Sequence, residues 1–254
     1  MTTALITGGT AGIGRAFADR FAALGYDLVL VARGQERLDA VAEELRGSSG
    51  VRVDTLAADL AVDEGTDAVR ERLAARERPV DILVNNAGFA LGQSFRRGSI
   101  EDEERLIDVH VRAVLRLTHA ALPGMVERGK GSVINVASVA AFVPRGTYSA
   151  AKAWVVSFSE SVAAELAGTG VRCMALCPGF THTEFHERAE IDEGQIPGWM
   201  WLNAPDVVQA AIDDLRKGLT VSVPTARYKL LVGAGKLVPR RISTRVSRSV
   251  SKRW

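Results

Sequence analysis

Seven short apolar runs recur along the chain, and each is bounded by glycine or polar residues. Between the runs lie longer stretches in which apolar residues return with the period of a helix. This alternation predicts six strand–helix units followed by a last strand. The runs are ALITG, DLVLVAR, VRVDTLAA, DILVNNAG, SVINVAS, VRCMALCPG and LTVSVP.

Some of the runs, such as LVLV and VINVA, are almost wholly apolar. Strands of this kind are buried on both faces, as in a parallel sheet covered by helices. Right-handed crossovers between parallel strands then produce a doubly wound sheet. We therefore expect an α/β fold of about seven strands carried by residues 1–225, with residues 226–254 as a C-terminal extension.

Composition is that of an ordinary globular domain. The 254 residues are 47% hydrophobic, which suits one domain with a sizeable core. No segment approaches the roughly 18 apolar residues of a membrane-spanning helix, and the N-terminus does not read as a signal peptide, so a cytoplasmic protein is expected. Cys173 and Cys177 lie in one apolar run, which predicts buried free thiols on a shared face.

Charge is distributed unevenly along the chain. Residues 215–254 hold eleven Lys or Arg and no acid, whereas the first 214 residues hold 21 basic and 30 acidic residues. A helix near the C-terminus would carry a narrow apolar stripe among basic residues, which favours packing on protein or a frayed chain end over peripheral contact with an anionic membrane. Nucleic acid is not an expected partner. The stripe residues are Ile242, Val246, Val250 and Trp254.

A glycine-rich segment, TGGTAGIG, follows the first predicted strand and opens a predicted helix. Glycine allows backbone amides to approach a pyrophosphate, which the helix N-terminus also attracts. A strand-to-helix turn uses glycine for its own geometry as well, so the position between strand and helix is what favours dinucleotide binding. The residues expected at the cofactor are Gly8, Thr10, Ala11, Gly12, Ile13 and Gly14.

The end of the second predicted strand bears on the choice of cofactor. Proteins that select NAD usually place an acidic residue there for the ribose 2′-hydroxyl, but this chain has Arg33. A guanidinium can hold the 2′-phosphate of NADP, with Arg15 as a second cation, although Arg33 could also be a solvated strand end. We expect NADP(H) to be preferred and NAD(H) to be the second choice. Asp59, followed by Leu60, is placed to accept a hydrogen bond from adenine, or else lies in an exposed loop.

Tyr148 and Lys152 lie four residues apart at the start of a predicted helix, so their side chains share a face. An adjacent ammonium and an oxidised nicotinamide would stabilise the phenolate and lower the pKa of Tyr148. Tyr148 could then exchange a proton with a carbonyl or alcohol oxygen while hydride moves, with Ser138 hydrogen-bonded to the same oxygen. The Tyr148–Lys152 spacing alone is weak evidence of catalysis, because tyrosine and lysine four residues apart are common in helices.

Five motifs stand in order along the chain: TGGTAGIG, NNAG at residues 85–88, Ser138, YSAAK from Tyr148, and PGFTHT at residues 178–183. In order and approximate spacing they resemble the short-chain dehydrogenase/reductase family, in its branch of about 250 residues. The resemblance covers roughly residues 3–225. It implies a Rossmann-type domain that binds a nicotinamide dinucleotide.

The resemblance also implies roles for individual residues. Tyr148 would be the acid/base, Lys152 would hold the nicotinamide ribose and tune Tyr148, and Ser138 would position the substrate carbonyl. Further cofactor contacts would come from Asn86, Ala87, Gly88, Pro178, Gly179, Thr181 and Thr183.

The implied activity is an NADP(H)-dependent oxidoreductase that interconverts a ketone or aldehyde and its alcohol. A homodimer or homotetramer is expected by resemblance, through helices near residues 100–126 and 148–167. The alternative is a protein that binds the cofactor without turnover and acts as a sensor or scaffold.

At two points the sequence departs from the family pattern. The interval from Ser138 to Tyr148 is ten residues, a little shorter than in many members, which trims the loop beside the substrate. His110 stands in a predicted helix where the family usually has an asparagine that supports a water leading to the lysine. We hypothesise that His110 replaces that asparagine in a proton relay and adds a pH dependence; the alternative is a packed core histidine.

Residues 180–205 are dense in aromatic side chains, and the resemblance places this segment over the substrate as a lid. Such a lid suits an apolar or aromatic carbonyl compound, or a lipid-like chain. The alternative for Trp199 and Trp201 is that they pack the lid onto the body. His182 and His186 have a metal-like spacing, but no third ligand is evident, so no metal is expected. The predicted substrate residues are Phe89, Ala140, Phe142, Phe180, Phe185, Trp199 and Trp201.

Overall fold

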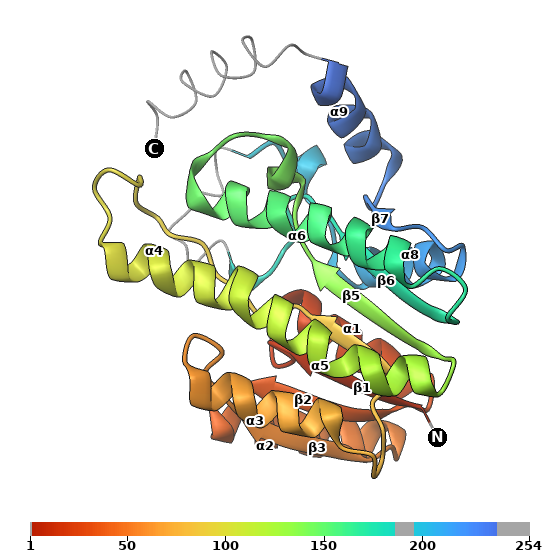
Figure 1. The fold of residues 1–254 in the computed structure, drawn as a ribbon. Coiled ribbons are helices and arrows are strands. Elements are labelled where there is room, and N and C mark those ends of the chain that lie inside the picture. The colour runs from red at the N-terminus through yellow and green to blue at the C-terminus, as the bar shows by residue number, and fades with distance from the viewer. Residues whose placement is uncertain (1, 186–195, 238–254) are drawn as a thin grey trace.

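A parallel sheet forms the centre of the computed structural model, which describes residues 2–185 and 196–237 (Figure 1). Its strands are β1 (Thr3–Thr7), β2 (Asp27–Ala32), β3 (Val53–Ala57), β4 (Ile82–Asn85), β5 (Gly131–Val136), β6 (Val171–Leu176) and β7 (Val221–Ser222). Their order is β3-β2-β1-β4-β5-β6-β7, and every neighbouring pair is parallel. The predicted doubly wound α/β fold is confirmed, and each strand coincides with one of the seven apolar runs, except that β1 and β5 begin one residue before theirs.

Helices cover both faces of the sheet. The α-helices are α1 (Gly12–Ala23), α2 (Gln35–Ser49), α3 (Asp63–Ala74), α4 (Ile100–Ile107), α5 (Ala113–Glu127), α6 (Gly146–Glu165), α8 (Ala204–Arg216) and α9 (Ala226–Leu237). A π-helical turn, η1 (Asp108–Arg112), joins α4 to α5, and short 3-10 turns are η2 (Val139–Phe142) and η4 (Gly198–Met200). Helices α1, α2 and α8 cover one face, and α3, α5 and α6 cover the other (Figure 1).

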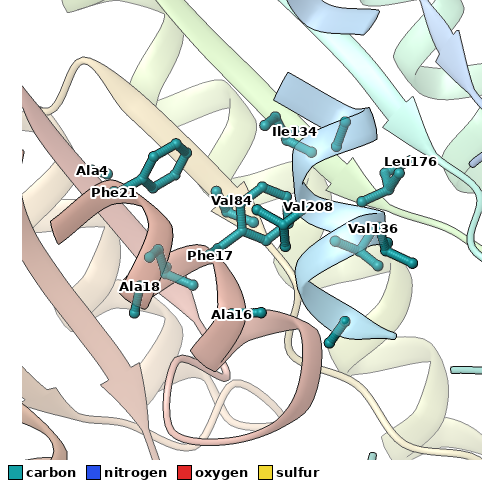
Figure 2. Packing of buried hydrophobic residues seen from close by; sticks show 14 of the residues in the cluster. Ala4, Ala16, Phe17, Ala18, Phe21, Val84, Ile134, Val136, Leu176 and Val208 are labelled. Atoms are coloured by element: carbon teal, nitrogen blue, oxygen red, sulfur yellow. The ribbon is translucent and has the colours of Figure 1, made fainter. Parts of the chain in front are cut away.

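Side chains of each strand alternate between two hydrophobic clusters. In β1, Ile6 packs in the cluster that holds α1, α2 and α8, whereas Leu5 packs in the cluster that holds α3 and α5. Figure 2 shows Phe17 of α1 and Val208 of α8 meeting above Val84 of β4. Because both faces are buried, the strand sequences are continuously apolar instead of alternating with polar residues.

The ends of β1 and β4 are tied together where the strand order reverses. The Thr7 hydroxyl accepts hydrogen bonds from the backbone N–H of Asn86 (2.9 Å) and of Ala87 (3.0 Å). In return, the Asn86 side-chain amide donates to the Thr7 carbonyl at 2.9 Å. These contacts hold the glycine turn after β1 beside the NNAG segment after β4.

The two cysteines are buried free thiols, as predicted. They do not share a face: Cys173 packs in the cluster of α3 and α5, and Cys177 in the cluster of α1 and α8. The prediction of a shared face is not supported by this packing, because the side chains of residues 174–177 all join the cluster of α1 and α8 while Cys173 does not.

The predicted C-terminal extension begins inside the folded body. Residues 226–237 form α9, and its Tyr228 is 2% exposed within the larger hydrophobic cluster. The predicted apolar stripe at residues 242–254 lies outside the described residues. Among the described residues, no helix is both long and apolar enough to cross a membrane.

Candidate active site

A cleft of about 1640 Å³ opens at the carboxyl ends of the strands, where the strand order reverses between β1 and β4. Open α/β sheets bind their ligands at this point because the loops after the strands diverge there. Pockets for drug-sized ligands measure about 300–1,000 Å³, so this cleft has room for a dinucleotide together with a second molecule.

The cleft brings together nearly all of the predicted site residues. Its lining includes all four predicted catalytic residues, every predicted cofactor residue except Gly14, and five of the seven predicted substrate residues. These are Ser138, Tyr148, Lys152 and His110; Gly8, Thr10, Ala11, Gly12, Ile13, Arg33, Asp59, Leu60, Asn86, Ala87, Gly88, Pro178, Gly179, Thr181 and Thr183; and Phe89, Ala140, Phe142, Phe180 and Phe185.

The glycine turn has the shape of a phosphate cradle. Gly8 and Gly12 have φ angles of +66° and +53°, which L side chains rarely adopt. A Cβ on Gly14 would lie 2.1 Å from the Gly8 carbonyl oxygen, so Gly14 permits the turn to close without lining the cleft. Ala11 offers no side-chain cap to the N-terminus of α1, so the N–H groups of the first turn fit the pyrophosphate of a dinucleotide.

Arg33 and Arg15 have different surroundings. Arg33 is exposed and lines the cleft, as predicted for a ligand of the 2′-phosphate. Arg15 does not line the cleft and forms ion pairs with Glu44 (2.6 Å) and Asp19 (2.8 Å). The prediction of Arg15 as a second cation at the phosphate is therefore not supported, because its charge is engaged along α1 and α2.

Arg37 is a cleft residue that sequence reasoning missed. Its guanidinium faces Glu184 of the lid in a two-pronged ion pair, in which Arg37 Nη1 donates to Glu184 Oε2 at 3.0 Å. Both residues line the cleft, so the pair joins the first turn of α2 to the lid. The sequence offers one indication of this role, because Arg37 stands four residues after Arg33. Nothing in the sequence indicates that Glu184 is its partner.

Asp59 is held by two hydrogen bonds that the sequence does not show. Its Oδ1 accepts from the Ala61 N–H at 3.0 Å, and its Oδ2 accepts from Arg105 Nη2 at 2.6 Å. Burial raises the pKa of Asp59, but the bonds from Ala61 and Arg105 and the charge of Arg33 outweigh it and hold the pKa below its ordinary value. Asp59 is thus an ionised group in the cleft, with the guanidinium of Arg105 beside it.

Ser138, Tyr148 and Lys152 gather at the ends of β5 and α6. The Ser138 hydroxyl accepts a hydrogen bond from the Ala140 N–H at 3.1 Å, which places it at the start of η2. Lys152 is 5% exposed, and its Nζ donates to the Val136 carbonyl at 2.6 Å. The same Nζ lies 5.7 Å from the centroid of the Tyr148 ring.

Burial is the main influence on the pKa values of Tyr148 and Lys152. It raises the pKa of Tyr148 to about 12, against the opposing effect of a hydrogen bond with Ser138. It also lowers the pKa of Lys152 to about 7, against the opposing influence of Cys177. The direction for Tyr148 is opposite to the sequence-based expectation, because burial desolvates the phenolate and only the hydrogen bond with Ser138 opposes it. Tyr148 is therefore a protonated acid at neutral pH.

His110 lies in η1, faces inward and is 1% exposed. Its Nε2 lies 3.0 Å from the Phe89 nitrogen and 2.7 Å from the Phe89 oxygen, so it bonds to the Phe89 backbone in either tautomer. The ring packs edge-on to Tyr148 at 5.4 Å. A Cβ on Gly88 would lie 2.4 Å from His110 Cε1, which explains why glycine precedes Phe89 here.

The predicted pH switch at His110 is not supported. Burial lowers the pKa of His110 well below its usual range, the charge of Lys152 lowers it further, and the backbone bond to Phe89 only partly opposes them. The imidazole therefore stays neutral across the physiological range, because its charged form would be desolvated beside a cation.

Replacing His110 by asparagine should test this assignment through stability. Below about pH 6.5 the unfolded chain protonates His110 and the folded chain does not, so wild type should lose up to about 1 kcal/mol of unfolding free energy per pH unit relative to His110→Asn. Urea unfolding at pH 5, 6, 7 and 8 measures the difference. A difference that does not vary with pH would show that the folded protein charges His110 as readily as the unfolded chain does.

Two of the predicted substrate residues lie elsewhere. Trp199 is 58% exposed, and Trp201 stacks on His182 with ring centroids 4.5 Å apart. Neither lines the cleft, and the Trp201 contacts with His182 and Phe180 fit the alternative that this indole packs the lid. His186 lies outside the described residues. Within the described ranges, no three His, Cys, Asp or Glu residues gather as a metal site would require.

The apolar side of the cleft continues from the catalytic tyrosine. The Phe185 ring lies 5.9 Å from the Tyr148 ring, and the Phe89 ring lies 5.8 Å from His110. Three apolar side chains that the sequence did not indicate, Met200, Leu231 and Val232, complete this wall from η4 and α9.

The sheet, the glycine cradle at its switch point and the buried Tyr148–Lys152 pair define a dinucleotide-dependent oxidoreductase. A family profile described as short chain dehydrogenase matches residues 2–194. The chain therefore belongs to the short-chain dehydrogenase family, and the resemblance inferred from the motifs is confirmed.

Known proteins with similar sequences or structures include enzymes with different substrates. Sulfoacetaldehyde reductase 2 from Chromohalobacter salexigens is 41% identical over 186 residues, 71% of this chain and 73% of that protein. A short-chain dehydrogenase from Sphingobium yanoikuyae, solved in complex with NADPH, is 39% identical with a TM-score of 0.85, over 93% of this chain and 94% of that one. The bulky-bulky ketone specific alcohol dehydrogenase from Comamonas testosteroni is 30% identical with a TM-score of 0.80, and the match covers 94% of this chain and 96% of that one.

Proposed function

We propose that this enzyme reduces an apolar ketone or aldehyde to its alcohol with NADPH, and that Tyr148 is the proton donor. The observation that carries the proposal is a protonated, half-buried phenol close to Ser138 and Lys152, in a cleft with an apolar wall. Reduction is the proposed direction because cells keep NADP largely reduced, and a protonated Tyr148 is the form that can donate a proton to the substrate oxygen.

Each residue then has a separate task. Bound NADPH supplies the hydride that reaches the carbonyl carbon. The Ser138 hydroxyl donates a hydrogen bond to the carbonyl oxygen and orients it. Tyr148 transfers its phenolic proton to that oxygen as the C–H bond forms. Lys152, held by Val136, lies where it can bind the nicotinamide ribose and stabilise the resulting phenolate.

Arg33 supports the choice of NADPH. It is exposed at the cleft close enough to Asp59 to lower the pKa of that carboxyl, so a cation stands beside the expected adenosine site. The Sphingobium yanoikuyae protein was solved with NADPH. A 2′-phosphate bound to Arg33 would gain charge-assisted hydrogen bonds that NADH lacks.

We further propose that His110 relays protons toward Lys152 as a neutral imidazole. Supporting this role, His110 is buried, Lys152 is near enough to influence its pKa, and its Nδ1 has no hydrogen-bond partner among the described residues. The alternative is that His110 only packs and fixes Phe89. A lower kcat in His110→Phe, with kcat retained in His110→Asn, would support the relay, because asparagine is the residue that the family usually has at this position. An unchanged kcat in His110→Phe would indicate that His110 only packs.

The cleft suits a bulky substrate more than a small charged one. Its wall beside Tyr148 is built from apolar side chains on four separate segments, and hydrophobic contact scales with the apolar area that a ligand buries. The structure of the bulky-bulky ketone specific alcohol dehydrogenase from Comamonas testosteroni aligns over 94% of this chain. The wall residues are Phe89, Phe142, Phe180, Phe185, Met200, Leu231 and Val232.

A carbonyl screen that follows NADPH absorbance tests the proposal. Aryl and alicyclic ketones should give kcat/KM values at least about tenfold above those of small aldehydes, since each added apolar group gains transition-state contact in the cleft. Higher values for small anionic aldehydes would contradict the assigned substrate class. NADPH binding without turnover of any carbonyl would instead favour the sensor or scaffold alternative.

Assembly and location stay predictions. A homodimer or homotetramer through α4, α5 and α6 is supported by the exposed side chains of Leu115 and Val126 on the outer surface of α5. Cytoplasmic location and peripheral membrane contact by the basic C-terminus rest on the sequence alone.

A further inference from the structure

Helix α9 is directed onto the lid by an unusual turn. Thr225, the residue before it, has a φ of +73°, a conformation that β-branched residues rarely adopt. The Lys229 N–H donates to the Thr225 carbonyl at 3.1 Å and begins the helix from this turn. Strained conformations of this kind persist only where the surrounding contacts determine them.

Tyr228 provides the central contact between α9 and the lid. Its hydroxyl accepts a hydrogen bond from the Phe180 N–H at 3.1 Å and donates one to the Met200 carbonyl at 2.8 Å. Its ring covers Gly179, where a Cβ would lie 2.0 Å from the ring carbon Cζ. Tyr228 therefore binds both ends of the lid at once, using the donor and the acceptor of a single hydroxyl.

Arg227 reinforces the same contact. It donates hydrogen bonds to the Trp199 carbonyl and, at 2.9 Å, to the Trp201 carbonyl. Two consecutive side chains of α9 thus hold three consecutive carbonyls, those of residues 199–201.

The two ends of the lid are also bonded to each other. The Leu202 N–H donates to the Phe180 carbonyl at 2.8 Å, and the His182 N–H donates to the Leu202 carbonyl at 3.0 Å. Both Phe180 and Met200 line the cleft. A shift of either end of the lid would therefore move the apolar wall beside Tyr148.

We propose that Tyr228 is a positioning residue for substrate binding: its hydroxyl, shared between Phe180 and Met200, holds the apolar wall of the cleft in place. The substrate part of this inference rests on the proposed function. Tyr228 also lines the cleft, but its hydroxyl is bonded to the lid backbone at Phe180 and Met200, so its role is to position the wall and not to act on the reacting atoms.

The test compares Tyr228→Phe with Tyr26→Phe. The first variant removes the bridging hydroxyl and keeps the ring over Gly179. The second removes a hydroxyl from a ring that stacks on Phe21 at the far end of α1, with no lid contact. Circular dichroism and thermal unfolding of both variants confirm that each is folded.

Hydrogen exchange of the NADPH-bound protein is the first measurement, and it requires no substrate. The Phe180 amide should exchange at least about tenfold faster in Tyr228→Phe, with smaller increases at His182 and Leu202, because its acceptor is lost. Tyr26→Phe should leave these amides unchanged. Equal exchange in the two variants would overturn the proposal.

Steady-state kinetics is the second measurement, with the best ketone from the carbonyl screen. Tyr228→Phe should raise KM about tenfold and change kcat by less than about threefold, because the wall moves while Tyr148, Lys152 and Ser138 stay in place. Faster exchange with an unchanged KM would overturn the role in substrate binding. If wild type reduces no ketone, the proposed function fails, and the exchange measurement still decides whether Tyr228 holds the lid.

Arg227→Gln gives an independent check from the surface of α9. Loss of its bonds to the carbonyls of Trp199 and Trp201 should raise KM in the same direction as Tyr228→Phe, by a smaller factor. A rise in kcat/KM would contradict the assignment of α9 as the support of the lid.

Discussion

Replacing Tyr148 by phenylalanine is expected to lower kcat by about 10³-fold while the Kd for NADPH changes by less than about threefold. The variant keeps the ring that contacts His110 and Phe185 and removes only the acidic proton. The hydroxyl that is hydrogen-bonded to Ser138 is lost, so the assigned proton donor is absent from the variant. Stopped-flow hydride transfer and NADPH fluorescence titration measure the two quantities.

Tyr26→Phe is the matched control, because it removes a phenolic hydroxyl outside the cleft. Its kcat should equal that of wild type. If Tyr148→Phe still turned over at more than about a tenth of the wild-type rate, another group would have to supply the proton. The assignment of Tyr148 as acid would then be wrong, even if the substrate class were correct.

Arg33→Ala is expected to raise the Kd for NADPH about 10- to 100-fold and to change the Kd for NADH by less than about threefold. The reason is that only NADPH carries the 2′-phosphate that a guanidinium can bind. Because Arg33 is exposed, the effect should shrink at high ionic strength. Isothermal titration with both cofactors, at low and high salt, measures it.

Arg15→Ala is the control for that measurement. Arg15 lies on the helix that follows the glycine turn, but its charge is paired with Glu44 and Asp19 and it does not line the cleft. Its removal should leave the Kd of both cofactors within about twofold. An equal loss of NADPH and NADH affinity in Arg33→Ala would reject the role of Arg33 at the 2′-phosphate.

Much of the site could be predicted because its residues follow strand ends in the sequence. Carboxyl ends of parallel strands meet at one edge of a sheet, so the segments that begin at Gly8, Asn86, Ser138 and Pro178 had to converge once the strands were recognised. Tyr148 and Lys152 are adjacent through helix geometry alone. For these residues a local sequence pattern is sufficient to predict their position, and all of them line the cleft.

Partners across the cleft could not be predicted in this way. Arg15 and Arg37 are both arginines near the cofactor segments, and only their folded neighbours show that Arg15 pairs along α1 and α2 while Arg37 reaches Glu184. Trp199 and Trp201 were predicted from composition to face the substrate, but in the folded protein Trp199 is 58% exposed and Trp201 stacks on His182. Tyr228 had no local signal, because its two bonding partners are 48 and 28 residues away.

By itself, the sequence determined the order of strands and helices, the glycine turn and the family, since these depend on the periodicity and spacing of nearby residues. The tertiary structure decided the charge states of Tyr148, Lys152 and His110 and the place of α9 on the lid. Burial sets those charge states through desolvation, which depends on every segment that packs around a group. A lid contact made by a residue after the last strand likewise exists only when the whole sheet has brought the two segments together.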